Sequence, residues 1–498
     1  MKGDFTRDTF NPTKHFSRVL IQQGRVTLEA DHNEQTDILL HYLRTLARDL
    51  IGPYAAPIEN QGFLLKDAGS ELEITRGRCY VDGILVENES DCTYATQPIV
   101  PDHPSTDEIK KDTGEIYWIY LDVWERLITS IEDDAIREKA LNGPDTCARA
   151  KVTWQVKALP VEKAIKTKTA QLEEESERIE KNKPLSESDT KRLQEIKEQI
   201  AEIQAVLVKL STPAEGELDP VVCQTPLTLL GGGYALLSAR VDPGKKVEDA
   251  CVTPPDAKYR GTENQLYRVE IHDGSNGATA SFKWSRDNGS VAMAWLGLGS
   301  SGNDLRVSHT RGFEAGNWVE LSYEKLDLLG LPGEFVKLAK VEGDTLSADL
   351  GTVDIQWSNQ LKNPKVRRWD QSGHEGTTLK HGVVPIKEGV WINLEDGIQI
   401  KFDDGGEYRT GDYWLIPARV ATGKIEWPGS EEAPDARQPH GIEHHYAPLG
   451  FVTWQDTKWK LEQSCGCVFE PQSSCFVALP EKVKTSPKRA PAKKRRTR

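Results

Sequence analysis

Three histidines near the C-terminal end of the sequence could bind a metal ion. His440, His444 and His445 lie within six residues, and on a helix the spacing of four between the first two would turn both imidazoles toward one zinc ion. Gly441 and Pro439 disfavour a helix here, and no third ligand lies nearby in the sequence. The pattern favours a loop held by histidine hydrogen bonds, and we expect no metal and no other cofactor.

Three cysteines form the one local concentration of thiols. Cys465, Cys467 and Cys475 have spacings of two and eight. Zinc sites and redox motifs usually place two residues between paired cysteines, and here only Gly466 lies between the first two. We therefore interpret these three cysteines as buried or unreactive thiols. The eight cysteines are scattered over a long chain, which fits reduced thiols in a cytoplasm.

The sequence lacks the motifs of common catalytic sites. It contains no P-loop, no Gly-x-Ser-x-Gly and no His-Glu-x-x-His, and no Gly-x-Gly-x-x-Gly lies between a predicted strand and helix. Acidic stretches such as residues 403–406 end in glycine and are typical of turns. We expect no catalytic residue, and hence no enzyme.

Charge is distributed unevenly along the 498 residues. The formal net charge is −14, yet residues 482–498 carry nine basic and no acidic residues, so the rest of the chain carries −23. This balance excludes a basic nucleic-acid-binding body and predicts no specific nucleic-acid partner. The tail, with Lys493, Lys494, Arg495 and Arg496, is expected to be disordered and able to contact an anionic surface, whether a membrane face, nucleic acid or an acidic neighbour.

The sequence predicts no membrane insertion. No stretch approaches the roughly 18 apolar residues of a membrane span, so we expect no integral membrane protein. The first residues also lack the apolar region of a secretory signal peptide.

The first 52 residues are predicted to form a docking segment. Residues 18–28 contain two apolar runs around a Gln-Gln-Gly turn, which predicts a hairpin. From Asn33 to Leu50 apolar residues recur at intervals of three and four. This spacing predicts a helix with one apolar face, and Gly52 should end it.

Residues 161–210 contain no glycine, aromatic residue or cysteine. Apolar residues in the second half follow the alternating spacing of a coiled-coil seam, and a Lys-Asn-Lys-Pro stretch separates the halves. The segment predicts an antiparallel coiled-coil hairpin that projects as an arm and packs on itself or on a neighbouring subunit. Its predicted interaction residues are Leu193, Ile196, Ile200, Ile203, Leu207 and Leu210.

The remaining segments are predicted to be rich in strands. Residues 53–160 and 211–470 contain short runs of β-branched and aromatic residues separated by turn formers. We expect a mainly β, α+β fold with one β-domain before the arm and a sandwich or several small sheets after it. Residues 471–498 are expected to form a linker and the disordered basic tail.

Ten stretches, taken in chain order, resemble a family encoded beside phage-tail-like contractile injection systems. They are KGDFTR (2–7), HFSRVLIQQGRV (15–26), EADHNEQ (29–35), GRCYVDG (77–83), YLDVWER (120–126), DTCAR (145–149), WQVK (154–157), YRGTENQLYRVE (259–270), FKWSRDNGSV (282–291) and YRTGDYWLIPAR (408–419). The arm and the tail lie outside this pattern.

This resemblance implies a structural subunit of such a particle, at or around the baseplate, with no catalytic residues. The expected partners are baseplate, sheath or tube proteins in a homo- or hetero-oligomer. Synthesis and assembly are expected in the cytoplasm, with release or membrane docking of the particle left open. The alternative is a carbohydrate-binding or carbohydrate-active β-scaffold, which would bring exposed tryptophans and at least two carboxylates into one groove. Cargo toxin is a weaker alternative, since no nucleophile or cofactor loop is evident.

Overall fold

A computed structural model shows a mainly β protein with a few helices, which confirms the predicted fold class. The structure describes residues 1–98, 109, 114–181, 187–211, 223–224, 227–230, 235–244, 258–274, 280–299, 302–372 and 378–470. The basic tail residues Lys493, Lys494, Arg495 and Arg496, and also Cys475, lie outside the described residues.

The first β-body is built around one long strand, β7 (Ile116–Ile128). It pairs with β8 (Arg149–Pro160) on one side and β23 (His444–Gln455) on the other, and β24 (Lys458–Ser464) completes this sheet. Two smaller sheets have the strand orders β25-β1-β4-β5 and β2-β3-β6. Their strands are β1 (Tyr54–Pro57), β2 (Leu65–Ala68), β3 (Glu71–Ile74), β4 (Gly77–Val81), β5 (Ile84–Asn88), β6 (Cys92–Thr93) and β25 (Val468–Phe469). The three sheets share one hydrophobic core.

The second β-body contains an open five-stranded sheet, a three-stranded sheet and a closed barrel. Their strand orders are β18-β11-β10-β21-β22, β19-β20-β9 and β12-β13-β16-β15-β14-β17. The strands are β9 (Leu237–Val241), β10 (Gln265–Asp273), β11 (Ser281–Ser285), β12 (Ala292–Leu298), β13 (Asp304–Val307), β14 (Trp318–Ser322), β15 (Glu334–Glu342), β16 (Thr345–Ala348), β17 (Lys365–Trp369), β18 (Val384–Pro385), β19 (Ile392–Asn393), β20 (Ile398–Phe402), β21 (Tyr413–Arg419) and β22 (Lys424–Ile425). The two open sheets share a core, and the barrel has its own.

The predicted β-rich region over 211–470 contributes strands to both bodies. Strands β23 and β24 belong to the first body, where β23 runs antiparallel to β7 from His444 opposite Trp124 to Thr453 opposite Ile116. A local pattern shows that a segment is extended, whereas long-range pairing decides which sheet it joins. This pairing ties the C-terminal part of the described chain to its N-terminal part.

The N-terminal helix α1 (Glu29–Ile51) forms as predicted, but begins four residues earlier. The Asp31 carboxylate accepts a hydrogen bond from the Leu28 amide (3.0 Å) and so satisfies a free donor at the helix start. The hairpin prediction for residues 18–28 is wrong. A turn forms at Gln23 and Gly24, yet in the described part of the chain no strand pairing includes this segment. An isolated two-stranded hairpin is marginally stable, and here no sheet supports it.

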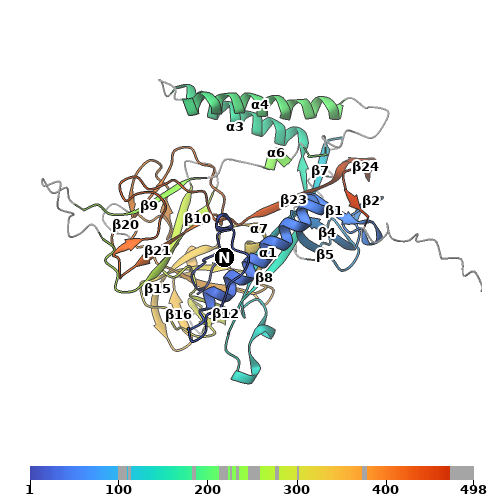
Figure 1. The fold of residues 1–498 in the computed structure, drawn as a ribbon. Coiled ribbons are helices and arrows are strands. Elements are labelled where there is room, and N and C mark those ends of the chain that lie inside the picture. Colours follow the sequence, from blue (N-terminus) through green and yellow to red (C-terminus); the bar gives the residue numbers. More distant parts are fainter. Residues whose placement is uncertain are drawn as a thin grey trace, which may run out of the picture.

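Two long helices, α3 (Val161–Lys181) and α4 (Glu187–Ser211), form the antiparallel pair predicted for residues 161–210. The Arg192 guanidinium on α4 makes hydrogen bonds of 2.8 and 3.0 Å to the Glu175 carboxylate on α3. The pair lies across the molecule above both β-bodies (Figure 1). Lys168 of α3 reaches Glu407 of the second body (3.5 Å), so the helices bridge the bodies instead of projecting freely.

The other helices in the described part of the chain are short. They are α6 (Leu227–Leu230), α7 (Glu324–Leu329), η1 (Pro12–Lys14), η2 (Ile58–Asn60), η3 (Asp134–Ile136), η4 (Lys139–Leu141) and η6 (Leu350–Thr352).

Candidate functional site

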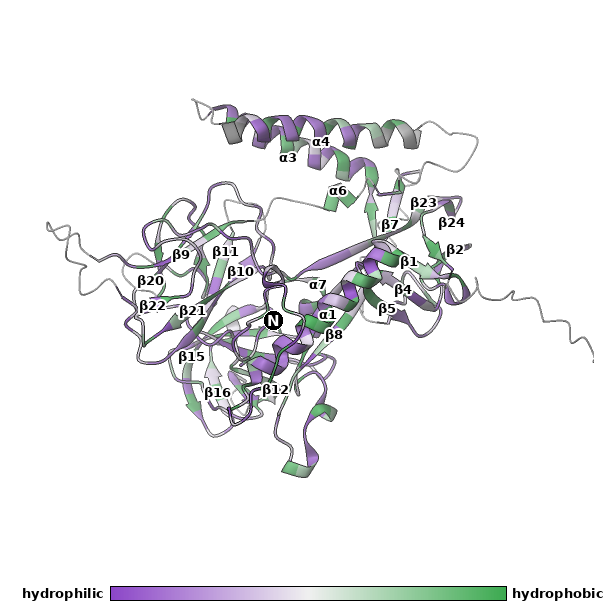
Figure 2. Cartoon of the chain, viewed as in Figure 1, coloured by the Kyte–Doolittle hydropathy of each residue, from purple (hydrophilic) through white to green (hydrophobic). Residues whose placement is uncertain are grey.

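The apolar side of α1 is uncovered. Leu39, Leu43, Leu46 and Leu50 expose 53, 62, 56 and 70 % of their surface. With the neighbouring exposed Leu40 and Tyr42 they form the surface that we call the α1 face. Hydrophobic and hydrophilic bands alternate along this helix in Figure 2. No helix of the described chain, α1 included, is long and apolar enough to span a bilayer.

The opposite side of α1 attaches to the first body. Ala30 and Ile38 are its buried residues. The Arg44 guanidinium donates a 2.9 Å hydrogen bond to the Glu125 carboxylate of β7. The Arg44 carbonyl packs so closely on Gly83, in the β4–β5 turn, that a Cβ there would lie 2.1 Å from its oxygen. These contacts fix the helix with its leucines turned outward.

The N-terminal segment continues this apolar surface. Two hydrogen bonds hold it against the first half of α1, from the Val19 amide to Gln35 (2.9 Å) and from the Thr9 hydroxyl to Glu34 (2.6 Å). Most of its own large apolar side chains are exposed, whereas Phe10 and Val19 are half-buried. The exposed members are Phe5, Phe16, Leu20, Ile21, Val26 and Leu28.

The start of the chain is anchored beside a cavity of about 320 Å³. The Lys2 amine lies 2.7 Å from the Glu270 carboxylate, which also pairs with Arg268 at 2.6 Å. Lys283 lies between this carboxylate (3.3 Å) and that of Glu320 (2.5 Å). Acids and bases alternate around this part of the lining and pair with one another, so the arrangement favours an internal ionic network over a ligand site.

The ionic network changes the titration of its members. Burial alone would raise the pKa of Glu320, but the cations Lys283 and Lys2 hold that pKa at about 2. Burial opposes ionisation of Glu270 as well, yet Lys2, Arg268 and Lys283 keep its pKa well below the usual range. Burial lowers the pKa of the neighbouring His272 to about 4. At neutral pH the two carboxyls are therefore ionised and this histidine is neutral.

The three candidate metal ligands are separated by their own partners. His444 Nδ1 lies 2.7 Å from Asp122, and His445 Nδ1 lies 2.9 Å from Asp82. Both residues begin β23, where adjacent side chains point to opposite faces. His440 lies against the Tyr413 ring instead, at 5.8 Å between centroids. Among the described residues no group of three potential ligands gathers around one point.

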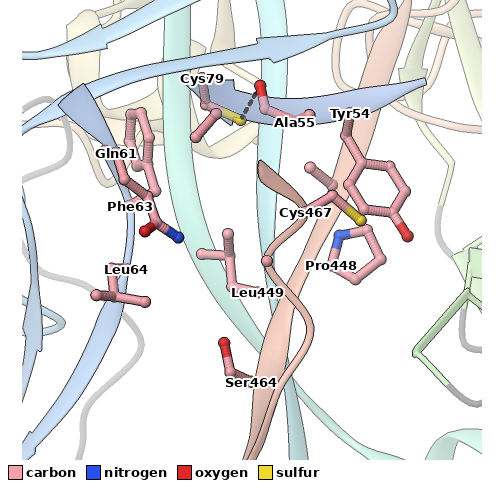
Figure 3. A pocket seen from close by; sticks show the side chains of 14 residues that line it. Tyr54, Ala55, Gln61, Phe63, Leu64, Cys79, Pro448, Leu449, Ser464 and Cys467 are labelled. Atoms are coloured by element: carbon pink, nitrogen blue, oxygen red, sulfur yellow. Dashed lines mark hydrogen bonds between the residues drawn. The ribbon is translucent and has the colours of Figure 1, made fainter. Parts of the chain in front are cut away.

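The cysteines depart from the expectation of free thiols. Cys465 forms a disulfide with Cys223, 242 residues away, between the end of β24 and the connection that follows α4. Cys467 is exposed and free. It lines a cavity of about 20 Å³ together with Tyr54 and Cys79, whose thiol donates to the Ala55 carbonyl at 3.6 Å (Figure 3). That volume holds about one water molecule, too little for a substrate.

Tryptophans are mostly part of the cores. Nine of the thirteen are buried and the other four, Trp318, Trp357, Trp391 and Trp427, are half-buried. One groove of about 520 Å³ does place Trp318 beside the carboxylates Glu334, Asp349 and Asp354. The carbohydrate alternative requires at least two carboxylates and exposed tryptophans in one groove. This groove has the carboxylates, but its tryptophan is half-buried.

The predicted interaction residues of the arm are used within the chain where the structure describes them. Leu193, Ile196 and Ile203 are buried and Ile200 is half-buried, in or beside a core that includes Leu172 of α3. The side chains of Leu207 and Leu210 are outside the described part. These four side chains could contact another subunit only if the helical pair opened.

Comparison with protein families gives a match along nearly the whole chain. Residues 1–492 match the model described as "Family of unknown function (DUF6519)". The chain belongs to this family. The DUF6519 match runs through the arm and into the tail, beyond the stretches that carry the motif resemblance, and its description assigns no activity.

Other comparisons add little to the DUF6519 assignment. A search of curated proteins found no match. Among solved structures the chain is similar to one titled "Crystal structure of TssK", with 10 % sequence identity, coverage of 81 % of this chain and 99 % of that chain, and a TM-score of 0.17. That degree of superposition does not establish a shared fold.

The α1 face is the feature whose role the sequence did not reveal in this DUF6519 chain. Its spacing predicts an apolar helix face, and the ordinary expectation is that such a face packs on the core. No signal in the sequence shows that the face stays uncovered, because residues 1–28 also carry large apolar side chains that could have packed on it.

Proposed function

We propose that this chain is a non-enzymatic structural subunit of a phage-tail-like contractile injection particle, at or around its baseplate. The order of ten motifs along the sequence supports the type of particle. The uncovered α1 face is the single observation that supports an assembly role, because it provides a surface for a neighbouring subunit.

The size of the exposed apolar stripe favours a permanent partner. Burying a leucine fully is worth about 1.5–3 kcal/mol, so the half-exposed leucines Leu39, Leu43, Leu46 and Leu50 each leave about 1 kcal/mol available. Contiguous apolar stripes of this kind on soluble proteins mark interaction sites. A partner that covers the stripe gains this free energy upon assembly.

The rest of the structure suits a rigid part of a machine. The helical pair bridges the two β-bodies through Lys168 and Glu407, and the Cys223–Cys465 disulfide fastens its connection to β24. The proposed partners are baseplate, sheath or tube proteins. The proposed setting is assembly in the cytoplasm, followed by release or membrane docking of the particle, and the basic tail is proposed to contact an anionic surface.

Incorporation into purified particles tests this function. Replacing Leu43 and Leu46 by Glu should leave the chain folded, since both side chains are exposed, yet remove it from particles in the producing cells. The matched control replaces Leu141 and Leu296, which are similarly exposed far from α1 in the sequence. Absence of the unmodified chain from particles would refute the function, and normal incorporation of the α1 variant would refute the role of the face.

A carbohydrate-binding role is the second candidate, favoured by the groove at Trp318. A ring beside three carboxylates could stack on a sugar and accept hydrogen bonds from its hydroxyls. Titration with a panel of oligosaccharides should then quench tryptophan fluorescence in the unmodified chain and less in Trp318→Ala. No response from the unmodified chain would end this candidate.

A further inference from the structure

The α1 face has the spacing of a two-helix seam. Leu39, Leu43, Leu46 and Leu50 follow one another at intervals of four, three and four. This alternation keeps side chains on the same side of a helix and lets them interlock with a second helix of the same repeat. The occupant that this surface fits is therefore a helix with an apolar seam.

We propose that this occupant is α1 of a second copy of the chain, packed antiparallel about a two-fold axis. All four seam residues are leucines, so the seam reads the same in both directions. With the axis between positions 44 and 45, Leu39 faces Leu50 of the second copy and Leu43 faces Leu46. Each of these contacts then joins two leucines, and every leucine of the seam has an apolar counterpart.

The charges beside the seam agree with this pairing. The side chains that flank the seam on α1 are Leu40 and Ala47 on one side and Tyr42 and Asp49 on the other, whereas His41 and Arg48 lie on the opposite side of the helix. In the antiparallel pairing Asp49 therefore lies beside Tyr42 of the second copy, and Leu40 beside Ala47. Arg44 is already bonded to the first body. No two carboxylates, and no two lysine or arginine side chains, are thus brought face to face, so the pairing meets no repulsion between like charges.

The surrounding surface supplies additional area. The 23-residue helix is about 34 Å long and 10–12 Å wide, so α1 alone offers less than the roughly 800 Å² per partner of a standard interface. The exposed apolar residues between Phe16 and Leu28 belong to the N-terminal segment that hydrogen bonds hold against the first half of α1. A two-fold axis at α1 lets both N-terminal segments contribute to one interface.

Mass in solution tests the proposal first. Light scattering of the purified full chain should give twice 55.6 kDa, and Leu43→Glu with Leu46→Glu should give the monomer mass. The control with Leu141→Glu and Leu296→Glu should remain dimeric. A monomeric unmodified chain at all concentrations tested, or a seam variant that stays dimeric, would overturn the proposal.

Disulfide crosslinking tests the register without relying on a disruptive variant. In a background with Cys147→Ser and Cys467→Ser, which removes the exposed described thiols, Leu43→Cys and Leu46→Cys chains are mixed and oxidised mildly. The mixture should crosslink across the two positions faster than either variant alone, since Cα atoms must come within about 7 Å. Faster crosslinking of either variant alone would overturn the antiparallel arrangement.

This inference names the partner of the face used in the proposed function and rests on that function for its biological setting. The two fail separately. A monomeric chain that enters particles through α1 would overturn self-pairing and leave the proposed function standing. A dimeric chain that is absent from particles would overturn the proposed function and leave self-pairing standing.

Discussion

Replacing Glu320 with Gln should destabilise the protein at neutral pH and much less in acid. The buried Glu320 carboxylate lies 2.5 Å from the Lys283 amine and accepts the Trp369 indole N–H at 2.8 Å. Glutamine keeps the size and an acceptor oxygen but removes the charge that Lys283 and Lys2 require. The substitution therefore isolates the ionic part of the contact.

The magnitude follows from the pKa of this carboxyl. Its ordinary value is 4.5 and the fold holds it at about 2, a difference worth roughly 3 kcal/mol at neutral pH. Because the pKa is lower in the folded state, this stabilisation is complete above about pH 5 and is lost as pH falls toward 2. At pH 3 we expect less than half of the neutral value, about 1.4 kcal/mol.

Urea unfolding followed by tryptophan fluorescence at pH 7 and pH 3 measures the difference in the free energy of unfolding between the variant and the unmodified chain. The matched control is Glu342→Gln, which removes an exposed carboxylate paired with Lys340 and should change the free energy of unfolding by less than about 0.5 kcal/mol. An effect of Glu320→Gln below 1 kcal/mol at pH 7, or equal at both pH values, would show that the charge of Glu320 does not stabilise the fold.

Three further predictions concern other parts of the fold. Cys223→Ser should lower the free energy of unfolding by about 2–5 kcal/mol, and peptide mapping without reductant should recover the link to Cys465 only in the unmodified chain; an equal thermal melt with no linked peptide would contradict the disulfide. Gly83→Ala should displace α1, because φ there is +79° and a Cβ would overlap the Arg44 carbonyl, and faster amide exchange throughout α1 would show it, whereas unchanged exchange would contradict the contact. Asp412→Asn should stabilise the protein at pH 7 by up to about 3 kcal/mol, since burial raises the pKa of this carboxyl to about 6; the gain should fade as pH drops from 6 to 4 in thermal melts, and a loss of stability at pH 7 would contradict the burial argument.

Local patterns in the sequence predicted individual elements well. Strands β4 and β5 and their turn at Asp82 and Gly83 follow from alternation around an Asp-Gly pair, and both turn residues have the positive φ that such a turn requires. The helices α3 and α4 follow from apolar spacing and a proline break. These features depend on neighbours in the chain, which a sequence displays directly.

Long-range pairings were not predictable in the same way. The addition of β23 to β7, the closure of the barrel and the disulfide from Cys223 to Cys465 join residues far apart in the chain. The prediction of a loop held by histidine hydrogen bonds is wrong for the loop, since His444 and His445 lie in strand β23. Both histidines do make hydrogen bonds, but their partners Asp122 and Asp82 are far away in the sequence. The spacing of α1 predicted its apolar face, but only the fold shows that the chain leaves this face uncovered.

An electron cryo-microscopy reconstruction of the purified injection particle would show whether the α1 face holds this chain in the assembly. We expect density for this chain near the baseplate, with Leu39, Leu43, Leu46 and Leu50 buried against another protein chain. A particle without this chain, or one in which the four leucines face solvent, would contradict the claim that the α1 face builds the assembly.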